Sequence, residues 1–315
     1  MDWFEQITGF PEASYAQTQS RLSVIDGALV SPHSPRRPKV GQLETPSLAE
    51  LRARVAALPS PLPKGGPTVS WLQADARQLH AHPESADALF QVASQFNLLE
   101  MTGPSVRPQD GVTRYAGDPT QGPACAMAAG AATIYRNYLH PVDGQPGQGG
   151  GRQVDCLHDL GVLLGNADGR LWKMQNGYPL MLTREGLHTI DAQLAALDDA
   201  GRDALKAALR IGLHWGVEVT DIRPVGHRVS QAFCSALPIA YQGALLRDGP
   251  WQRFASLVLE ASYEATLLAG VLNLARVGCA KVFLTRVGAG AFGVMSVQNT
   301  LINEELPHFR WPRTS

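Results

Sequence analysis

A glycine-rich segment near the end of the chain is the first candidate for chemistry. Residues 282–293 read VFLTRVGAGAFG, and the last six of them fit the dinucleotide pattern G-x-G-x-x-G. Three interpretations are open: a nicotinamide or flavin site, a loop whose backbone N–H groups bind a diphosphate, or a tight turn that needs positive φ angles. A nicotinamide fold needs a ribose-binding acid about 20 positions beyond the glycines. That position is Arg313 and the sequence ends at Ser315, so the nicotinamide interpretation is disfavoured.

Acidic and amide side chains follow two expected strands. Residues 68–74 (TVSWLQA) precede Asp75, and residues 88–95 (ALFQVASQ) precede Asn97 and Glu100. Both runs have the length and the β-branched or aromatic content of buried strands. In an open α/β sheet the ligand site lies at the carboxyl ends of the strands. We therefore expect these residues and the glycine loop to face one site.

The elements that must position these residues follow from the apolar pattern. Helices are expected at 122–138, as one or two helices within 185–216, and at 251–276, where Gly278 ends the helix. Residues 229–241 are expected to form a strand that runs into a Pro-containing loop, and a further strand is expected at 281–287. Strands that alternate with helices predict an α/β fold with a largely parallel sheet.

Other segments lie outside this alternation. Residues 1–66 contain a helix at 47–58 with a capping signal, followed by a Pro- and Gly-rich linker. Residues 144–151 (GQPGQGGG) predict a flexible loop, and Asp-Gly and Asn-Gly pairs at 168–169 and 176–177 predict a hairpin or meander.

Composition limits the class of protein. The chain has 315 residues, of which 44% are apolar and 17% charged, so it can bury a substantial core. Its formal charge is −1 and no basic block exceeds the Arg36-Arg37-Pro38-Lys39 cluster, which makes nucleic acid an unlikely partner. No apolar run approaches the roughly 18 to 20 residues of a membrane span, so no membrane partner is expected. Four widely spaced cysteines without a signal segment predict a cytoplasmic protein with reduced thiols.

Taken together, the order of these pieces resembles the macrodomain family of ADP-ribose binders. In that family a strand ending in an acidic residue precedes a strand ending in Asn, a glycine loop and a helix. A long helix, a strand and a second glycine loop with an aromatic residue follow much later. The match covers roughly residues 68–128 and 227–300. The motifs FQVASQFNLLE, TQGPACAMAAGAATIYRN, NGYPL and FLTRVGAGAFG are similar to a divergent subgroup that includes a bacterial effector hydrolysing ADP-ribosyl-arginine.

The resemblance implies a set of ligand-binding residues. Asp75, with Ala76 beside it, would accept a hydrogen bond from the adenine amino group, and Asn97 would lie at the distal ribose. Phe292 would lie against the nucleotide, within a loop that wraps the diphosphate. That loop comprises Val287, Gly288, Ala289, Gly290, Ala291, Phe292 and Gly293, and weaker phosphate or ribose contacts are expected from Thr120, Gln121 and Gly122. The first glycine loop departs from the family, because residues 110–126 read DGVTRYAGDPTQGPACA and lack a triple glycine.

Hydrolysis of an ADP-ribosyl linkage breaks the bond at C1″ of the distal ribose through an oxocarbenium-like state. This step needs a carboxylate that accepts a proton and a group that stabilises developing charge. Asp110 and Asp118, eight residues apart in the first loop, are the leading acid/base candidates. Glu100 is a third candidate that would orient a ribose hydroxyl or the leaving guanidinium. The alternatives are turn-forming aspartates and a helix-start charge.

Metal binding and cysteine catalysis are less favoured. His80 and His82 form one set, and Asp155, His158 and Asp159 another, but neither has a third ligand at a recognised spacing. Cys125 lacks an indicated histidine partner and is interpreted as a buried thiol.

The sequence therefore predicts a macrodomain-like three-layer α/β/α sandwich at residues 67–315, with a mixed, largely parallel sheet and an insertion at about 141–226. Residues 1–66 are expected to form an extension that packs on it. The predicted function is that of an ADP-ribosylhydrolase without a cofactor, whose substrate is a protein ADP-ribosylated on a side chain, arginine being favoured. Two alternatives stay open: a non-catalytic ADP-ribose reader, and a hydrolase of a free NAD-derived metabolite.

Overall fold

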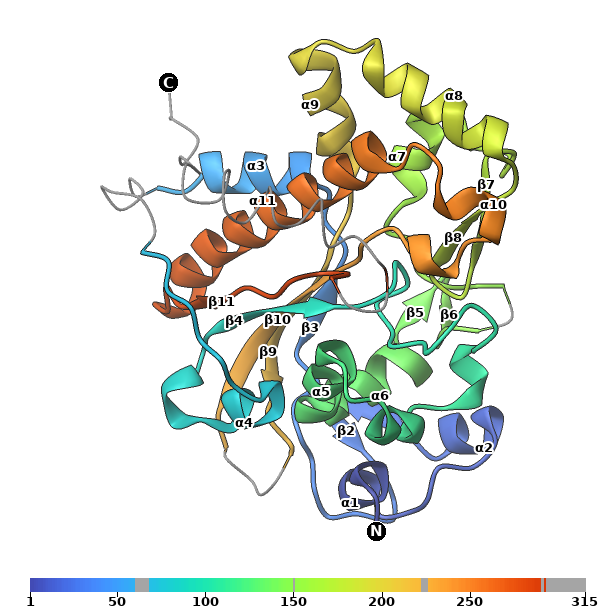
Figure 1. The fold of residues 1–315 in the computed structure, drawn as a ribbon. Coiled ribbons are helices and arrows are strands. Elements are labelled where there is room, and N and C mark those ends of the chain that lie inside the picture. The colour runs from blue at the N-terminus through green and yellow to red at the C-terminus, as the bar shows by residue number, and fades with distance from the viewer. Residues whose placement is uncertain (60–67, 150, 222–225, 290–291, 293–315) are drawn as a thin grey trace.

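The computed structural model describes residues 1–59, 68–149, 151–221, 226–289 and 292, which form three layers (Figure 1). The middle layer is a five-stranded sheet with the strand order β11-β4-β10-β9-β3. Its strands are β3 (Gln42–Glu44), β4 (Leu89–Ala93), β9 (Gly212–Glu218), β10 (Arg228–Cys234) and β11 (Val282–Phe283).

Both strand directions occur in this sheet. Strand β4 pairs in parallel with β10 and with β11, whereas β9 is antiparallel to β10 and β3 is antiparallel to β9. The α/β class predicted from sequence is confirmed, with a mixed sheet. The parallel part is confined to β11, β4 and β10, so their carboxyl ends meet at one edge of the sheet.

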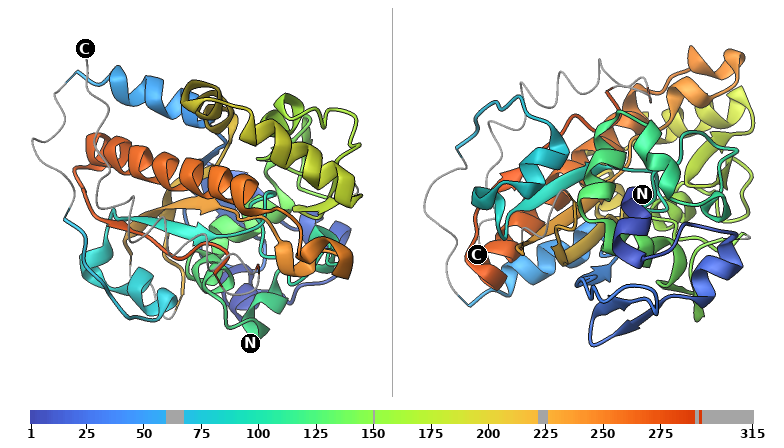
Figure 2. Two further views of the ribbon diagram at one scale, coloured as in Figure 1. Left: turned by 45° about the horizontal axis from the view of Figure 1, so that its top comes forward. Right: turned by 90° about the horizontal axis from the view of Figure 1, so that it is seen from below.

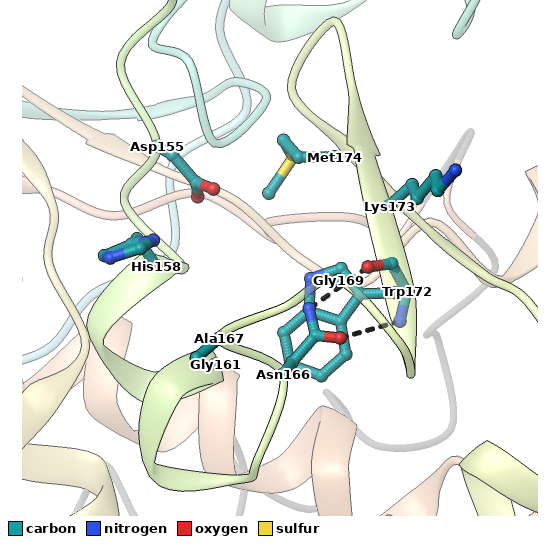
Figure 3. A pocket seen from close by; sticks show the side chains of 9 residues that line it. All are labelled: Asp155, His158, Gly161, Asn166, Ala167, Gly169, Trp172, Lys173 and Met174. Carbon is teal, nitrogen blue, oxygen red and sulfur yellow. Dashed lines mark hydrogen bonds between the residues drawn. The ribbon is translucent and has the colours of Figure 1, made fainter.

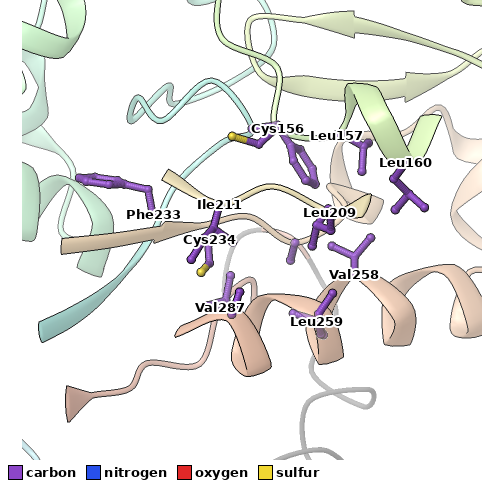
Figure 4. Packing of buried hydrophobic residues seen from close by; sticks show 14 of the residues in the cluster. Cys156, Leu157, Leu160, Leu209, Ile211, Phe233, Cys234, Val258, Leu259 and Val287 are labelled. Carbon is purple, nitrogen blue, oxygen red and sulfur yellow. The ribbon is translucent and has the colours of Figure 1, made fainter. Parts of the chain in front are cut away.

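Helices cover both faces of the sheet. Helices α3 (Leu48–Ala56) and α11 (Gln252–Val277) lie on one face, and α4 (Ala76–Ala81), α5 (Gln121–Ala128) and α6 (Gly130–Tyr138) lie on the other (Figures 1 and 2). Figure 4 shows part of the core on the α11 side. There Val258 and Leu259 project from α11 toward the sheet, and Cys234 and Val287 belong to the same buried cluster.

The remaining elements surround these layers. The helices are α1 (Trp3–Thr8), α2 (Tyr15–Ser20), α7 (His158–Leu163), α8 (Arg184–Ala195), α9 (Asp199–Ala208) and α10 (Ala244–Arg247). The two-stranded pairs are β1 (Ser23–Ile25) with β2 (Ala28–Val30), β5 (Pro141–Val142) with β6 (Gln145–Pro146), and β7 (Trp172–Gln175) with β8 (Tyr178–Met181). Short 3₁₀ helices are η1 (Pro83–Ser85), η2 (Pro108–Asp110), η3 (Thr113–Gly117) and η4 (Ile239–Tyr241).

Elements with strong local signals are confirmed. Helix α3 begins with a full capping box, in which Ser47 and Glu50 satisfy each other's backbone N–H groups. Helix α11 ends at Gly278, whose φ of 77° is left-handed. The β7–β8 hairpin turns at Asn176 and Gly177, with φ angles of 49° and 82°, which is the conformation that Asn-Gly favours.

The prediction of a strand at residues 68–74 is wrong. This segment has no regular structure, and its Val69, Trp71 and Leu72 side chains are exposed. Strand β4 pairs with β10 and β11, and residues 68–74 join neither edge of the sheet. Strand-like composition alone is not sufficient, because a strand also needs pairing and packing partners from other segments.

Two further predictions need correction. The helical region predicted to reach residue 216 ends at α9, because residues 212–218 form β9 and are mostly buried in the sheet. The predicted loop at 144–151 contains β6, and its Gln148 side chain is fully buried. Gln148 donates hydrogen bonds to the carbonyl oxygens of Asn97 (3.0 Å) and Arg136 (3.2 Å).

Segments outside the minimal macrodomain match also build the central layers. Strand β3 and helix α3, both within residues 1–66, form the edge of the sheet and part of one helical layer. Strand β9, within residues 141–226, lies between β10 and β3. The sheet of this chain therefore cannot form from the residues of the match alone.

The prediction that no apolar run approaches the length of a membrane span does not hold for helix α11. Its 26 residues are long and apolar enough to cross a bilayer. However, 78% of its most apolar window is buried inside the protein. The helix lies along the sheet (Figure 2), and its buried apolar side chains form part of the hydrophobic core.

Candidate functional site

A cavity of about 310 Å³ opens at the carboxyl ends of the parallel strands and is called the strand-end cavity below. Open α/β sheets bind ligands at this edge. Its wall combines residues after β4, the start of α5, the segment after β11 and two tyrosines. These are Ala93, Ser94, Gln95, Glu100, Met101, Thr102, Asp118, Thr120, Gln121, Gly122, Pro123, Tyr178, Ala236, Tyr241, Thr285, Arg286, Val287, Gly288 and Phe292.

The fold brings many of the sequence-predicted residues into this cavity. Those that line it are Glu100, Asp118, Thr120, Gln121, Gly122, Val287, Gly288 and Phe292. Those that do not line it are Asp75, Ala76, Asn97, Asp110 and Ala289. Gly290, Ala291 and Gly293 lie outside the described residues.

Glu100 is the most unusual group in the cavity wall. Only 3% of the residue is exposed, and its Oε1 atom has no hydrogen-bond partner within the described part of the chain. Burial raises the pKa of this carboxyl well above its ordinary value. The nearby Arg136 charge acts in the opposite direction, and Asp118 raises the pKa further. A raised pKa favours the protonated form of the Glu100 carboxyl.

The loop between β4 and Glu100 is held by its own amide side chains. Gln95 accepts a hydrogen bond from the Met101 N–H (2.7 Å) and donates one to the Met101 carbonyl (3.0 Å). The Tyr115 hydroxyl accepts from the Glu100 N–H at 3.1 Å. Leu98 completes the turn with a left-handed φ of 65°. These bonds fix the backbone on both sides of Glu100 and so place its side chain at the cavity wall.

The N-terminus of α5 packs directly on the end of β4. The Gln121 side chain donates to the Gln91 carbonyl and accepts from the Ala93 N–H, both at 2.9 Å, as a neighbouring strand would. A Cβ atom on Gly122 would collide with the Ala93 carbonyl and the Glu100 carboxyl. The backbone N–H groups of Gln121 and Gly122 have no partner among the described residues. Such N–H groups, at the positive end of a helix, favour an anion.

The two predicted catalytic aspartates have different surroundings. One oxygen of Asp118 accepts hydrogen bonds from the Thr120 N–H (2.9 Å) and hydroxyl (2.7 Å), and the residue lines the cavity. Asp110 lies outside the cavity. Its two carboxyl oxygens accept hydrogen bonds from the guanidinium and from the backbone N–H of Arg107, both at 2.9 Å. These hydrogen bonds lower the pKa of Asp110. Asp110 thus stabilises a local turn, and Asp118 is the aspartate that can reach a ligand.

Asp75 and Asn97 also have structural partners. Asp75 accepts a hydrogen bond from the Gln78 N–H at 3.0 Å and so caps α4. The fully buried Asn97 accepts from the Leu99 N–H (3.1 Å) and donates to the Gln153 side chain (2.8 Å). Their adenine and ribose roles stay predictions from the resemblance, without support from the cavity geometry.

Sequence reasoning missed part of the aromatic wall. Phe292 lines the cavity, where it forms a cluster with Tyr178 and Tyr241. The ring centroid of Phe292 lies 5.6 Å from that of Tyr178 and 5.7 Å from that of Tyr241, and the ring centroids of the two tyrosines are 5.1 Å apart. The NGYPL motif contains Tyr178 and could have indicated it. Nothing in the sequence connects Tyr241 to this site.

A second cavity of about 280 Å³ lies between α7 and the β7–β8 hairpin (Figure 3). Asp155 and His158 line it, while the Lys173 side chain extends away from both of them. Burial raises the pKa of Asp155. No group of three His, Cys, Asp or Glu side chains that could hold a metal ion occurs within the described ranges. None of the predicted ligand-binding residues reaches this cavity, so the strand-end cavity is the better candidate site.

Comparison of the chain with protein-family models, with curated proteins and with solved structures found no match.

Proposed function

We propose that the chain is a macrodomain-like ADP-ribosylhydrolase that releases ADP-ribose from a modified protein side chain, arginine being the favoured acceptor. The observation that carries the proposal is the joint presence of Glu100 and Asp118 in the strand-end cavity. Glu100 is buried, which raises the pKa of its carboxyl, whereas Asp118 is partly exposed. Two carboxyl groups in such different surroundings suit acid and base roles in one reaction.

The ligand would be bound by parts of the wall with matching chemistry. The N–H groups of Gln121 and Gly122, at the start of α5, have no partner in the described part of the chain and suit the diphosphate, together with the backbone around Gly288. The aromatic cluster of Tyr178, Tyr241 and Phe292 gives this part of the wall an aromatic surface that suits a ribose or a nucleobase.

In the reaction, Asp118 accepts a proton from water as the water oxygen forms a bond to C1″ of the distal ribose. Glu100 donates its proton to the leaving nitrogen as the C1″–N bond breaks. The products are ADP-ribose and the unmodified side chain. Return of the proton from Asp118 to Glu100 through solvent completes the cycle, and no cofactor is required.

The experiment measures release of ADP-ribose from arginine, glutamate and serine conjugates, together with ADP-ribose binding by calorimetry. Wild type should bind ADP-ribose and release it from arginine. Asp118→Asn should bind with similar affinity but lose release by roughly 10²- to 10⁴-fold, the usual contribution of a general base. Asp110→Asn is the matched control, because Asp110 lies outside the cavity, and it should keep both properties.

The outcomes separate the alternatives. Binding without release from any conjugate would favour the reader interpretation. Release only from a free NAD-derived metabolite would favour the third interpretation. If wild type binds no ADP-ribose, the proposal is wrong.

A further inference from the structure

Arg286 contributes a positive charge to the wall of the strand-end cavity. Among the described lining residues it is the single Lys or Arg. It is exposed and forms no ion pair with any described residue. A guanidinium that lines a cavity without a carboxylate partner is available for an anionic ligand.

The backbone on both sides of Arg286 is fixed. The Tyr263 hydroxyl, from the buried helix α11, donates to the Thr285 carbonyl at 2.6 Å and accepts from the Val287 N–H at 3.4 Å. The Gln91 side chain, from β4, accepts from the Thr285 N–H at 3.2 Å. Val287 is buried in the core. Residue 286 is therefore held at the cavity wall, while its side chain stays on the outside of the core.

Trp71 holds the guanidinium without neutralising it. The Arg286 guanidinium carbon lies 5.4 Å from the Trp71 ring centroid, within the range of a cation–π interaction. Trp71 is 73% exposed, which is unusual for this residue type. The contact with Trp71 restricts the long Arg286 side chain but does not use its N–H donors. Arg286 therefore loses less rotamer entropy on binding an anion than an unrestrained arginine would.

Other parts of the cavity wall also favour an anion. The N–H groups of Gln121 and Gly122 are unpaired within the described chain, at the positive end of α5. Glu100 is almost completely buried, and its Oε1 atom has no hydrogen-bond partner among the described residues. Burial raises the pKa of its carboxyl, which reduces the repulsion of a phosphate. The wall thus combines one guanidinium and two backbone N–H donors with the carboxyl groups of Glu100 and Asp118.

We propose that Arg286, held over Trp71, binds the diphosphate of the ligand and completes the anion site begun by the α5 N-terminus. The inference rests on the proposed function for the identity of the ligand, ADP-ribose. A planar guanidinium can donate two parallel hydrogen bonds to phosphate oxygens and adds a full positive charge, which backbone N–H groups do not carry. Arg286 is a binding residue in this proposal and takes no part in proton transfer.

The experiment is calorimetry of the full chain with ADP-ribose, and with inorganic diphosphate as a probe of the anion site alone. Arg286→Gln should weaken ADP-ribose binding roughly 10- to 100-fold, the effect of losing a charge-assisted hydrogen bond. Arg286→Lys should weaken it less, because a charge remains without the two-pronged geometry. Trp71→Leu should weaken it about two- to fivefold, as expected for an exposed cation–π contact.

The control is Arg228→Gln, an exposed arginine at the amino end of β10. It changes the net charge equally and should leave both affinities unaltered. Melting temperatures of the Arg286 and Arg228 variants should agree, which separates binding from folding.

The outcomes distinguish this inference from the proposed function. If wild type binds ADP-ribose and Arg286→Gln binds it equally well, the inference is wrong and the proposed function stands. If wild type binds diphosphate in an Arg286-dependent manner but not ADP-ribose, the anion site stands and the proposed function fails. If wild type binds neither, both fail.

Discussion

Replacing Glu100 with Gln removes a proton-binding group from the core while keeping its shape. In wild type, burial raises the pKa of Glu100 well above its ordinary value of 4.5, so the folded state keeps a proton that the unfolded chain loses. This contribution to stability is fully present below pH 4.5 and is lost as pH rises toward the folded-state pKa. Glu100→Gln cannot ionise and should lack this loss.

The magnitude follows from the linkage of proton binding to unfolding. Each pH unit between the two pKa values lowers the free energy of unfolding of wild type by about 1.4 kcal/mol relative to the variant. From pH 5 to pH 7 the difference between the two proteins should therefore change by up to about 3 kcal/mol in favour of Glu100→Gln. That is a large part of the roughly 5 to 15 kcal/mol typical of a folded protein.

The assay is urea unfolding of wild type and Glu100→Gln at pH 5, 6 and 7. The exposed residue Glu84, changed to Gln, controls for the loss of one carboxyl group. The reasoning would be refuted by stability curves that run parallel, or by a wild type that gains stability over the variant as pH rises. Either result would mean that Glu100 is ionised and paired with the nearby Arg136 guanidinium, and it could not then serve as the acid.

Three further predictions concern the elements around the cavity. Gly122→Ala should destabilise the fold by about 1 to 3 kcal/mol, because its Cβ would collide with the Ala93 carbonyl; an unchanged urea midpoint would contradict this close packing. Glu12→Gln should cost about 1 to 3 kcal/mol in urea unfolding, since Glu12 accepts from the Tyr138 hydroxyl at 2.6 Å and from backbone N–H groups before α5. Asp75→Ala should lose about 1 kcal/mol of α4 capping and leave ADP-ribose affinity unchanged in calorimetry. A tenfold loss of affinity would instead restore the adenine role predicted for Asp75.

Local signals in the sequence determined the elements that depend on neighbouring residues. The capping box at Ser47, the hairpin turn at Asn176 and the helix end at Gly278 each involve residues within a few positions of one another. Their geometry follows from backbone sterics and short-range hydrogen bonds, so the pattern suffices. The strand prediction at 68–74 was wrong because strand formation also depends on pairing and packing with distant segments, which a local pattern does not contain.

Likewise, the sequence determined that carboxyl groups would stand near the ends of the strands, but not how each would behave. Asp110 and Glu100 were both candidates. The first is paired with Arg107, three residues away, whereas the second is enclosed by Tyr115 and Gly122. Desolvation depends on every element packed around a group, whatever its distance in sequence. Only the tertiary structure could therefore decide which carboxyl has a raised pKa, and that Arg286, in the wall of the same cavity, forms no ion pair with a described residue.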